Sequence, residues 1–193
     1  QTAVIPVMIA GQDVIGQAQT GTGKTAAFAL PILQNLDEAH RHVQGLVLAP
    51  TRELALQVAQ AITDFGRGRS VRVLAVYGGA PYRPQISALN RGVDIVVGTP
   101  GRLIDLMNKD ILDISQVRTV VLDEADEMLS MGFIEDIEAI LSQTPEQRQT
   151  ALFSATMPAE IRRLAEQYLH EPQTITIRSE KVTLETIEQR LYL

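Results

Sequence analysis

Residues 13–25, "DVIGQAQTGTGKT", join an apolar strand pattern to a glycine-rich turn and the start of a helix. The turn is close to the phosphate-binding loop GxxxxGK[ST], whose backbone N–H groups face phosphate oxygens at a helix N-terminus. Gly23, Lys24 and Thr25 fit this pattern, whereas Ala18 stands where the first glycine is expected. The stretch therefore predicts a strand, a phosphate loop and a helix, and the departure at Ala18 makes the other motifs decisive.

Further apolar, β-branched runs recur along the chain and alternate with helical patterns. They occupy residues 45–50, 71–79, 94–100, 118–126, 150–156 and 174–177. Continuous apolar strands that alternate with helices are typical of a parallel sheet covered on both faces. We therefore predict an α/β fold with a three-layer, doubly wound parallel sheet.

Apolar residues at helical spacing are expected to form the core between the sheet and its helices. The two stripes are Leu54, Val58, Ala61, Ile62 and Phe65, and Ile161, Leu164, Ala165, Tyr168 and Leu169. We also expect Met128 and Met131 to be core residues. The segment 35–45 is expected to be a solvated loop that exposes His40 and His42.

Composition excludes several classes of site. The 193 residues contain no cysteine and three histidines, and the formal net charge is −6. Disulfides and thiolate metal sites are therefore excluded, so a metal would be a hard cation on oxygen ligands. The acidic balance means that any nucleic-acid binding must be local. We expect a cytoplasmic protein without a membrane span, and the first residue, Gln1, suggests a piece of a longer chain.

Small or charged residues follow five of the predicted strands. These strand ends read "AQTGTGKT", "APTRELA", "YGG", "GTPGR" and "LDEAD". In open α/β sheets, ligands bind beyond the carboxyl ends of the strands. The chemistry is therefore expected to collect at one edge of the sheet.

Two of these strand ends predict a nucleoside triphosphatase. Lys24 would contact the β- and γ-phosphates, and the Thr25 hydroxyl would ligate Mg²⁺. Asp123 would hold the Mg²⁺, usually through water, and Glu124 would face an attacking water as general base. The alternatives are a glycine-rich turn with an N-capping threonine, and an acidic helix N-terminus that favours the helix dipole.

The motifs together resemble the N-terminal RecA-like domain of a DEAD-box ATP-dependent RNA helicase, of bacterial type. The matching residues are Gln1, "AQTGTGKT" (18–25), "PTRELA" (50–55), Gly78 with Gly79, "TPGR" (99–102), "DEAD" (123–126) and "SAT" (154–156). Alanine at the first loop position is ordinary in that family. The resemblance covers nearly the whole chain and implies a RecA-like P-loop fold, with ATP and Mg²⁺ as cofactors.

The resemblance also implies how the nucleotide is held. Gln1 matches the glutamine that reads the adenine edge, and its amide offers both a donor and an acceptor. The alternative is a solvated terminal glutamine, and the aromatic residue that stacks on adenine in the family is missing from this chain. The remaining nucleotide contacts would come from Ala18, Gln19, Thr20, Gly21, Thr22, Gly23, Lys24 and Thr25.

A second set of residues is implied to line a track for single-stranded RNA. These residues are Pro50, Thr51, Arg52, Gly79, Thr99, Pro100, Gly101 and Arg102. The two arginines can fork onto phosphates, and the glycines permit close approach of the RNA. Such contacts read the backbone and the 2′-OH and are largely blind to sequence. The alternative is that both arginines form salt bridges at helix starts.

A third set is implied to couple ATP hydrolysis to strand separation. Ser154 and Thr156 lie at a strand end, where their hydroxyls could hydrogen-bond Asp126 or Glu124. The alternative is that the hydroxyls cap a helix before Pro158, which would be its first residue.

The expected organisation is a RecA-like domain over residues 1–178, followed by a linker and the start of a second RecA-like domain over 179–193. An arginine that the second domain supplies can be worth ~10³ to 10⁵ in rate. We therefore expect this piece alone to be nearly inactive. The predicted partners are RNA and the second domain, with no membrane, and the oligomeric state stays open.

Two other functions remain as alternatives. One is an RNA-binding or scaffolding module whose nucleotide site serves as a switch without productive hydrolysis. Glu124 disfavours it, because such a switch needs no positioned base. The other is a DNA-directed or non-nucleic-acid P-loop ATPase, which "PTRELA" together with "TPGR" disfavours.

Overall fold

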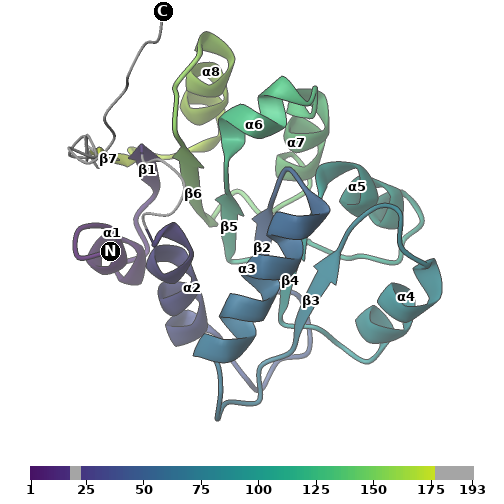
Figure 1. Ribbon diagram of the computed structural model, residues 1–193. Helices are drawn as coiled ribbons and strands as arrows, with labels where there is room; N and C mark the ends of the chain where they lie inside the picture. Colours follow the sequence, from purple (N-terminus) through teal and green to yellow (C-terminus); the bar gives the residue numbers. More distant parts are fainter. Residues whose placement is uncertain (18–22, 177–193) are drawn as a thin grey trace, which may run out of the picture.

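The computed structural model describes residues 1–17 and 23–176, and within them the seven predicted strands form one parallel sheet (Figure 1). The strand order is β3-β4-β2-β5-β6-β1-β7. The strands are β1 (Val14–Gln17), β2 (Gly45–Leu48), β3 (Val73–Val76), β4 (Ile95–Gly98), β5 (Thr119–Leu122), β6 (Gln149–Ser154) and β7 (Gln173–Thr176). Every neighbouring pair is parallel, which confirms the predicted sheet.

Helices cover both faces of the sheet, so the three-layer, doubly wound architecture is confirmed. They are α1 (Val4–Ile9), α2 (Lys24–Asn35), α3 (Arg52–Phe65), α4 (Tyr82–Asn90), α5 (Pro100–Asn108), α6 (Ala125–Ser130), α7 (Ile134–Leu141) and α8 (Ala159–Tyr168). One core cluster contains α1, α2 and α3, and the other contains α5 to α8, with α4 packed against it. In the described part of the chain, no helix is long and apolar enough to cross a bilayer.

The strands supply both cores because successive side chains point to opposite faces. In β2, Leu46 and Leu48 belong to one core and Val47 to the other. The four strands β2, β4, β5 and β6 are buried along their whole length, as expected for central parallel strands. The edge strand β7 is mostly exposed and polar. The apolar runs of the sequence therefore mark the centre of the sheet.

Two residues expected in the core are exposed. Phe65 is 45% exposed because it is the last residue of α3, beyond the part of the helix that packs on the sheet. Met131 is 46% exposed because α6 ends one residue earlier and the chain turns outward at Gly132. Met128, which lies within α6, is fully buried as predicted.

The segment 35–45 is less solvated than expected. His40 is exposed, but His42 is only half-exposed. Three other residues of the segment, Leu36, Val43 and Gln44, are buried, because they close the core at the amino ends of the strands.

Backbone hydrogen bonds continue past the carboxyl ends of four neighbouring strands. The Thr99 N–H donates to the Val76 carbonyl (3.0 Å), and the Ala49 N–H donates to the Gly98 carbonyl (2.9 Å). The Asp123 N–H donates to the Leu48 carbonyl (3.0 Å). The loops that carry the predicted site residues therefore begin from strand ends that are bonded to one another.

Candidate functional site

Gly23, Lys24 and Thr25, the last three residues of the predicted phosphate loop, lie at the start of α2. Gly23 is the N-cap residue of α2 and has φ 77°, a left-handed conformation that glycine adopts without strain. Lys24 is the first residue of the helix and is only 9% exposed, and Thr25 lies in the same first turn. Thr25 is therefore inside the helix and does not cap it.

The rest of the predicted loop, Ala18, Gln19, Thr20, Gly21 and Thr22, lies outside the described residues, so the nucleotide contacts assigned to it stay predictions.

Gln1 lies beside the end of this loop. Its Nε2 donates to the Gly23 carbonyl oxygen at 3.4 Å, and a Cβ added to Gly23 would collide with that nitrogen. The Gln1 carbonyl accepts the N–H groups of Val4 and Ile5, which ties Gln1 to the start of α1. The first residue is therefore adjacent to the phosphate loop, although its side chain is exposed.

Lys24 faces the end of β5. Its Nζ lies 3.8 Å from Oδ1 of Asp123, which is only 2% exposed. Burial raises the pKa of Asp123 to about 6, against the opposing effect of the Lys24 charge. Within the described residues, Oδ1 of Asp123 has no hydrogen-bond partner although it is buried. A buried carboxylate oxygen without a donor matches the hard oxygen ligand that Mg²⁺ takes.

Glu124 occupies a strained backbone position next to Asp123. It has φ 53° and ψ 53°, a left-handed conformation that is rare for residues other than glycine, and α6 begins directly after it. Such strain costs about 1 to 3 kcal/mol and is concentrated at functional sites. Glu124 borders a cleft of about 380 Å³ together with Lys24, Asp126 and Thr156. Asp123 is not among the residues that line this cleft, so the two acidic neighbours have different surroundings.

Asp126 joins the ends of β5 and β6. Its backbone N–H donates to Ser154 Oγ (3.1 Å), and its Oδ2 accepts from the backbone N–H (2.9 Å) and the hydroxyl (2.8 Å) of Thr156. Burial by itself would raise the pKa of Asp126, but the bonds from Thr156 and Ala155 outweigh burial and the pKa is lowered. The hydrogen bonds to Asp126 expected from the sequence are present.

The alternative role for these hydroxyls, capping of a helix, is not observed. α8 begins at Ala159, and its N-cap residue is Pro158 rather than a serine or threonine. No side chain caps this helix. Pro158 therefore precedes the helix, and it is not the first helical residue that the sequence suggested.

The loop after β2 starts α3. Pro50 precedes Thr51, the N-cap residue, whose Oγ1 accepts from the Leu54 N–H at 3.2 Å. Arg52 is exposed, and its guanidinium carbon lies 5.0 Å from the ring centroid of Tyr77 at the end of β3. Arg52 has a cation–π contact where the sequence alternative predicted a salt bridge, and no carboxylate pairs with it in the described residues.

The ends of β3 and β4 carry open glycines. Gly79 has φ 74°, and no atom lies within 4 Å of a Cβ added there or at Gly101. Thr99 is the N-cap residue of α5 and Pro100 is its first residue, but the Thr99 side chain makes no capping bond. The two glycines therefore leave room for a ligand to approach the backbone.

Arg102 is held by neighbours within the chain. It donates from Nη1 to Oε1 of Gln85 (3.2 Å) and from Nη2 to the Ala80 carbonyl (3.1 Å), and its guanidinium lies 4.1 Å from the Tyr82 ring centroid. Like Arg52, it forms no ion pair with a carboxylate of the described chain. Gln85 and Tyr82 belong to no motif, so the sequence carries no signal for their contacts with Arg102.

Strand order divides the predicted residues into two groups. Lys24, Asp123 and Ser154 follow β1, β5 and β6, which are neighbours in the sheet, whereas Arg52, Gly79 and Arg102 follow β2, β3 and β4. Because every strand of the sheet is parallel, both groups lie at its carboxyl edge, with β2 beside β5 (Figure 1). The fold therefore places the residues predicted for the two ligands in two adjacent groups.

Larger cavities lie elsewhere in the described residues. Two hollows of about 490 and 510 Å³ share Gly11, Gln147 and Arg148, near the amino ends of the strands. The smaller cleft beside Lys24 and Glu124 has the relevant chemistry, so size does not locate the site. In the described residues, no group of three or more His, Asp or Glu side chains could hold a metal by itself. A cation bound at Asp123 would therefore need further oxygen ligands from a nucleotide or water.

Comparisons with known proteins agree with this geometry. The DEAD/DEAH box helicase family pattern matches residues 1–164. The chain is 55% identical over 189 residues to the DEAD-box ATP-dependent RNA helicase CshA of Bacillus cereus, covering 98% of this chain and 36% of that protein. It is 57% identical over 190 residues to the ATP-dependent RNA helicase DeaD of Escherichia coli, covering 98% of this chain and 30% of that protein.

Solved structures are also similar to this chain. A hypothetical ATP-dependent RNA helicase from Sulfolobus tokodaii matches with a TM-score of 0.84 and 46% identity, over 91% of this chain and 51% of that one. A DEAD box protein from Methanococcus jannaschii matches with a TM-score of 0.87 and 42% identity, over 91% and 48%. The chain thus spans about a third of the curated relatives and about half of the solved chains. It belongs to the DEAD/DEAH box helicase family.

Proposed function

We propose that this chain is the ATP-binding half of an ATP-dependent RNA helicase. The observation that carries the proposal is the buried pair of Lys24 and Asp123, 3.8 Å apart, with Oδ1 of Asp123 lacking a hydrogen-bond partner among the described residues. A lysine paired with an unsatisfied carboxylate at the same edge of the sheet suits a phosphate chain and its cation.

The nucleotide would lie along the phosphate loop between Gln1 and the end of β5. The Lys24 ammonium would contact the β- and γ-phosphates, and Gln1 would read the adenine edge. The Thr25 hydroxyl and the Asp123 carboxylate would hold Mg²⁺. When bound, Mg²⁺ would neutralise charge on the phosphate oxygens. The position of Gln1 beside Gly23 supports a common ligand for the two motifs.

Glu124 would act as the general base. A water would attack the γ-phosphorus, the bond to ADP would break, and the proton of the water would pass to the Glu124 carboxylate. Three observations support this role: Glu124 borders the cleft, its backbone is strained, and its environment differs from that of Asp123.

The RNA backbone would lie across the ends of β2, β3 and β4. Arg52 and Arg102 would contact phosphates, and the open backbone at Gly79 and Gly101 would add N–H donors. Thr51, Thr99, Pro50 and Pro100 would complete this surface. These contacts would not distinguish base sequences.

Further parts of the proposal concern the longer protein. We propose that a second RecA-like domain follows residue 178, since the curated relatives are about three times as long as this chain. It would supply charge-stabilising arginines and the other half of the RNA track, so the present chain alone would be nearly inactive. The bonds of Asp126 to Ser154 and Thr156 would transmit hydrolysis to the RNA side. We also propose the cytoplasm as the compartment.

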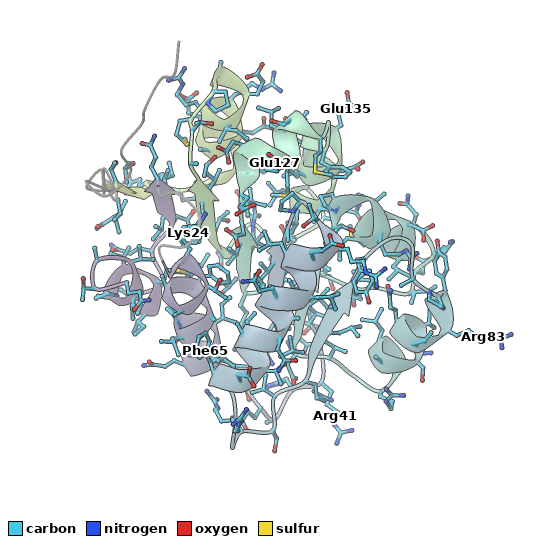
Figure 2. The ribbon with its side chains drawn as sticks, in the orientation of Figure 1. Lys24, Arg41, Phe65, Arg83, Glu127 and Glu135 are labelled. Carbon is cyan, nitrogen blue, oxygen red and sulfur yellow. The ribbon has the colours of Figure 1, made fainter. Side chains whose placement is uncertain are left out.

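Two substitutions in the full-length protein test the nucleotide site. Lys24→Ala should abolish binding of ATP and ADP in calorimetry, and the unaltered protein should bind ATP in preference to GTP. Glu124→Gln should bind ATP normally but lose hydrolysis by about 10² or more, as expected when a general base is removed. The matched control is Glu127→Gln, because Glu127 is exposed and borders the same cleft (Figure 2); it should hydrolyse ATP normally.

Three outcomes would count against this proposal. Normal hydrolysis by Glu124→Gln would refute its role as base, and an unaltered protein that binds ATP without hydrolysing it would indicate a nucleotide switch. Equal stimulation by deoxyribo- and ribo-oligonucleotides would indicate a DNA-directed ATPase.

A further inference from the structure

Gln85 is a buried amide in a helix that is otherwise mostly exposed. It lies in α4 and is only 5% exposed, and it is the one fully buried residue of that helix. Its Nε2 donates to the Tyr77 carbonyl at 3.3 Å, and its Oε1 accepts from Arg102 Nη1 at 3.2 Å. A buried amide is costly unless it is hydrogen-bonded. Both bonds of Gln85 go to the surface proposed to bind RNA.

Arg102 has two further contacts that hold it in place. Its Nη2 donates to the Ala80 carbonyl, directly after the two glycines, and the Tyr82 ring lies against its guanidinium at 4.1 Å. A guanidinium has five N–H donors, so these two hydrogen bonds leave three for a phosphate. Arg102 is thus held in place and still has N–H groups that can donate to a phosphate.

Tyr82 is itself supported from α5. Its ring is 37% exposed, and its hydroxyl donates to Asp105. Lys109 Nζ lies 4.4 Å from the ring centroid and pairs with Asp105 at 2.7 Å. The ring is therefore held by Arg102 and Asp105 of α5 and by Lys109 at its C-cap, and is not left free to stack on a base.

We propose that Gln85 and Tyr82 are positioning residues that hold Arg102, and through it the turn at residues 78–80, in the arrangement that binds an RNA phosphate backbone. The inference rests on the proposed function and adds two residues that belong to none of its motifs. An arginine side chain loses much rotamer freedom when it is fixed, and a site that is ordered before binding avoids that cost. Without Gln85 and Tyr82, the RNA itself would have to order the Arg102 side chain.

The test uses the full-length protein and polyuridylate RNA, and it measures the RNA concentration that gives half-maximal stimulation of ATP hydrolysis. Gln85→Met keeps the length of the side chain and removes both hydrogen bonds, so that concentration should rise about tenfold, equivalent to about 1.4 kcal/mol. The KM for ATP and the hydrolysis rate without RNA should not change, because Lys24 and Glu124 follow other strands.

Gln44→Met is the matched control. Gln44 is also a buried glutamine, 3% exposed, with two hydrogen bonds, both to the backbone of Asp37 (2.9 and 2.7 Å). It precedes β2, at the opposite end of the strand from the proposed RNA surface. Gln44→Met should lower the thermal unfolding temperature about as much as Gln85→Met, yet leave the half-stimulating RNA concentration unchanged.

A double-mutant cycle separates positioning from general destabilisation. In an Arg102→Ala background, Gln85→Met should cause no further loss of RNA response, because its partner is already gone. Tyr82→Leu provides a second route, because it alters an exposed ring and buries no polar group. It should raise the half-stimulating RNA concentration about two- to fivefold, as expected for loss of a cation–π contact.

The outcomes distinguish the inference from the function on which it rests. If the unaltered protein shows no RNA stimulation, the proposed function fails and the inference fails with it. If the unaltered protein responds but Gln85→Met and Tyr82→Leu respond equally well, or if the losses from Gln85→Met and Arg102→Ala add, the positioning role alone is overturned.

Discussion

The buried carboxylate of Asp123 makes the ligand-free chain less stable than it could be. Burial raises its pKa from 3.8 to about 6. The folded state therefore binds this proton more tightly than the unfolded state, and the free energy of unfolding falls as the pH rises from about 4 to about 6. Asp123→Asn removes the titrating group and should remove this loss.

The pKa shift gives the size of the effect. A shift of about two units corresponds to about 3 kcal/mol once the carboxyl is ionised in both states. Linkage then predicts that Asp123→Asn raises the free energy of unfolding by about 3 kcal/mol at pH 7.5 and by about 1 kcal/mol at pH 4.5. Both values already include the attraction between Asp123 and Lys24, because that attraction lowers the pKa that burial raises. This increase in the free energy of unfolding should therefore be larger at pH 7.5 than at pH 4.5 by about 2 kcal/mol.

The assay is urea unfolding of this chain at both pH values, without nucleotide. Glu166→Gln is the control, because Glu166 is an exposed carboxylate in the last turn of α8. It should shift the stability little, and by the same amount at both pH values. If the difference between Asp123→Asn and the unaltered chain were the same at pH 4.5 and 7.5, burial would not govern the ionisation of Asp123. The same substitution should weaken binding of ATP with Mg²⁺, so stability would rise while function falls.

Two further substitutions test the packing that supports the site, both by urea unfolding. Asp94→Ala should lower the free energy of unfolding by about 3 kcal/mol, because Asp94 is buried and accepts the Arg72 backbone N–H and two hydrogen bonds from the Arg72 guanidinium. The control is Glu138→Ala, which breaks the exposed pair with Arg163 and should lower the free energy of unfolding by less than about 0.5 kcal/mol. Gly16→Ala should cost about 1 to 3 kcal/mol, because a Cβ in β1 would meet the buried Phe153 ring at 2.5 Å. Equal losses at Asp94 and Glu138, or no loss at Gly16, would contradict this account of the packing.

The sheet could be predicted from the sequence because its central strands are buried on both faces. Runs such as Val120 to Leu122 leave no polar face, and the strand ends that follow them are rich in glycine and charge. The same logic placed Lys24 and Asp123 at one edge of the sheet, where β6 alone separates the two strands that they follow.

The apolar stripes predicted core residues less well at the ends of the helices than within them. Phe65 continues the spacing of Val58 and Ile62 but lies beyond the surface that the helix covers. Periodicity states which face of a helix turns inward, and it does not state where the sheet beneath it stops. The exposed Met131, one residue past the end of α6, has the same explanation.

The surroundings of Arg102 could not be predicted at all. Gln85 is an ordinary helical glutamine in the sequence, and its partners, Tyr77 and Arg102, are 8 and 17 residues away. Only the fold brings them together. The sequence alternative for Arg102, a salt bridge, was wrong because a glutamine, a carbonyl and an aromatic ring hold the guanidinium instead.

The spacing between the hydrogen-bonded strands also sets the distances along the edge where the proposed ligands would bind. Neighbouring strands lie about 4.8 Å apart, so the five steps from β3 to β1 separate these two strands by about 24 Å. Only β2 and β5 meet at the boundary, where the Asp123 N–H donates to the Leu48 carbonyl. Substitutions in the loops after β3 and β4 would therefore leave the proposed nucleotide site undisturbed, whereas the loop after β2 would have to suit both proposed ligands at once.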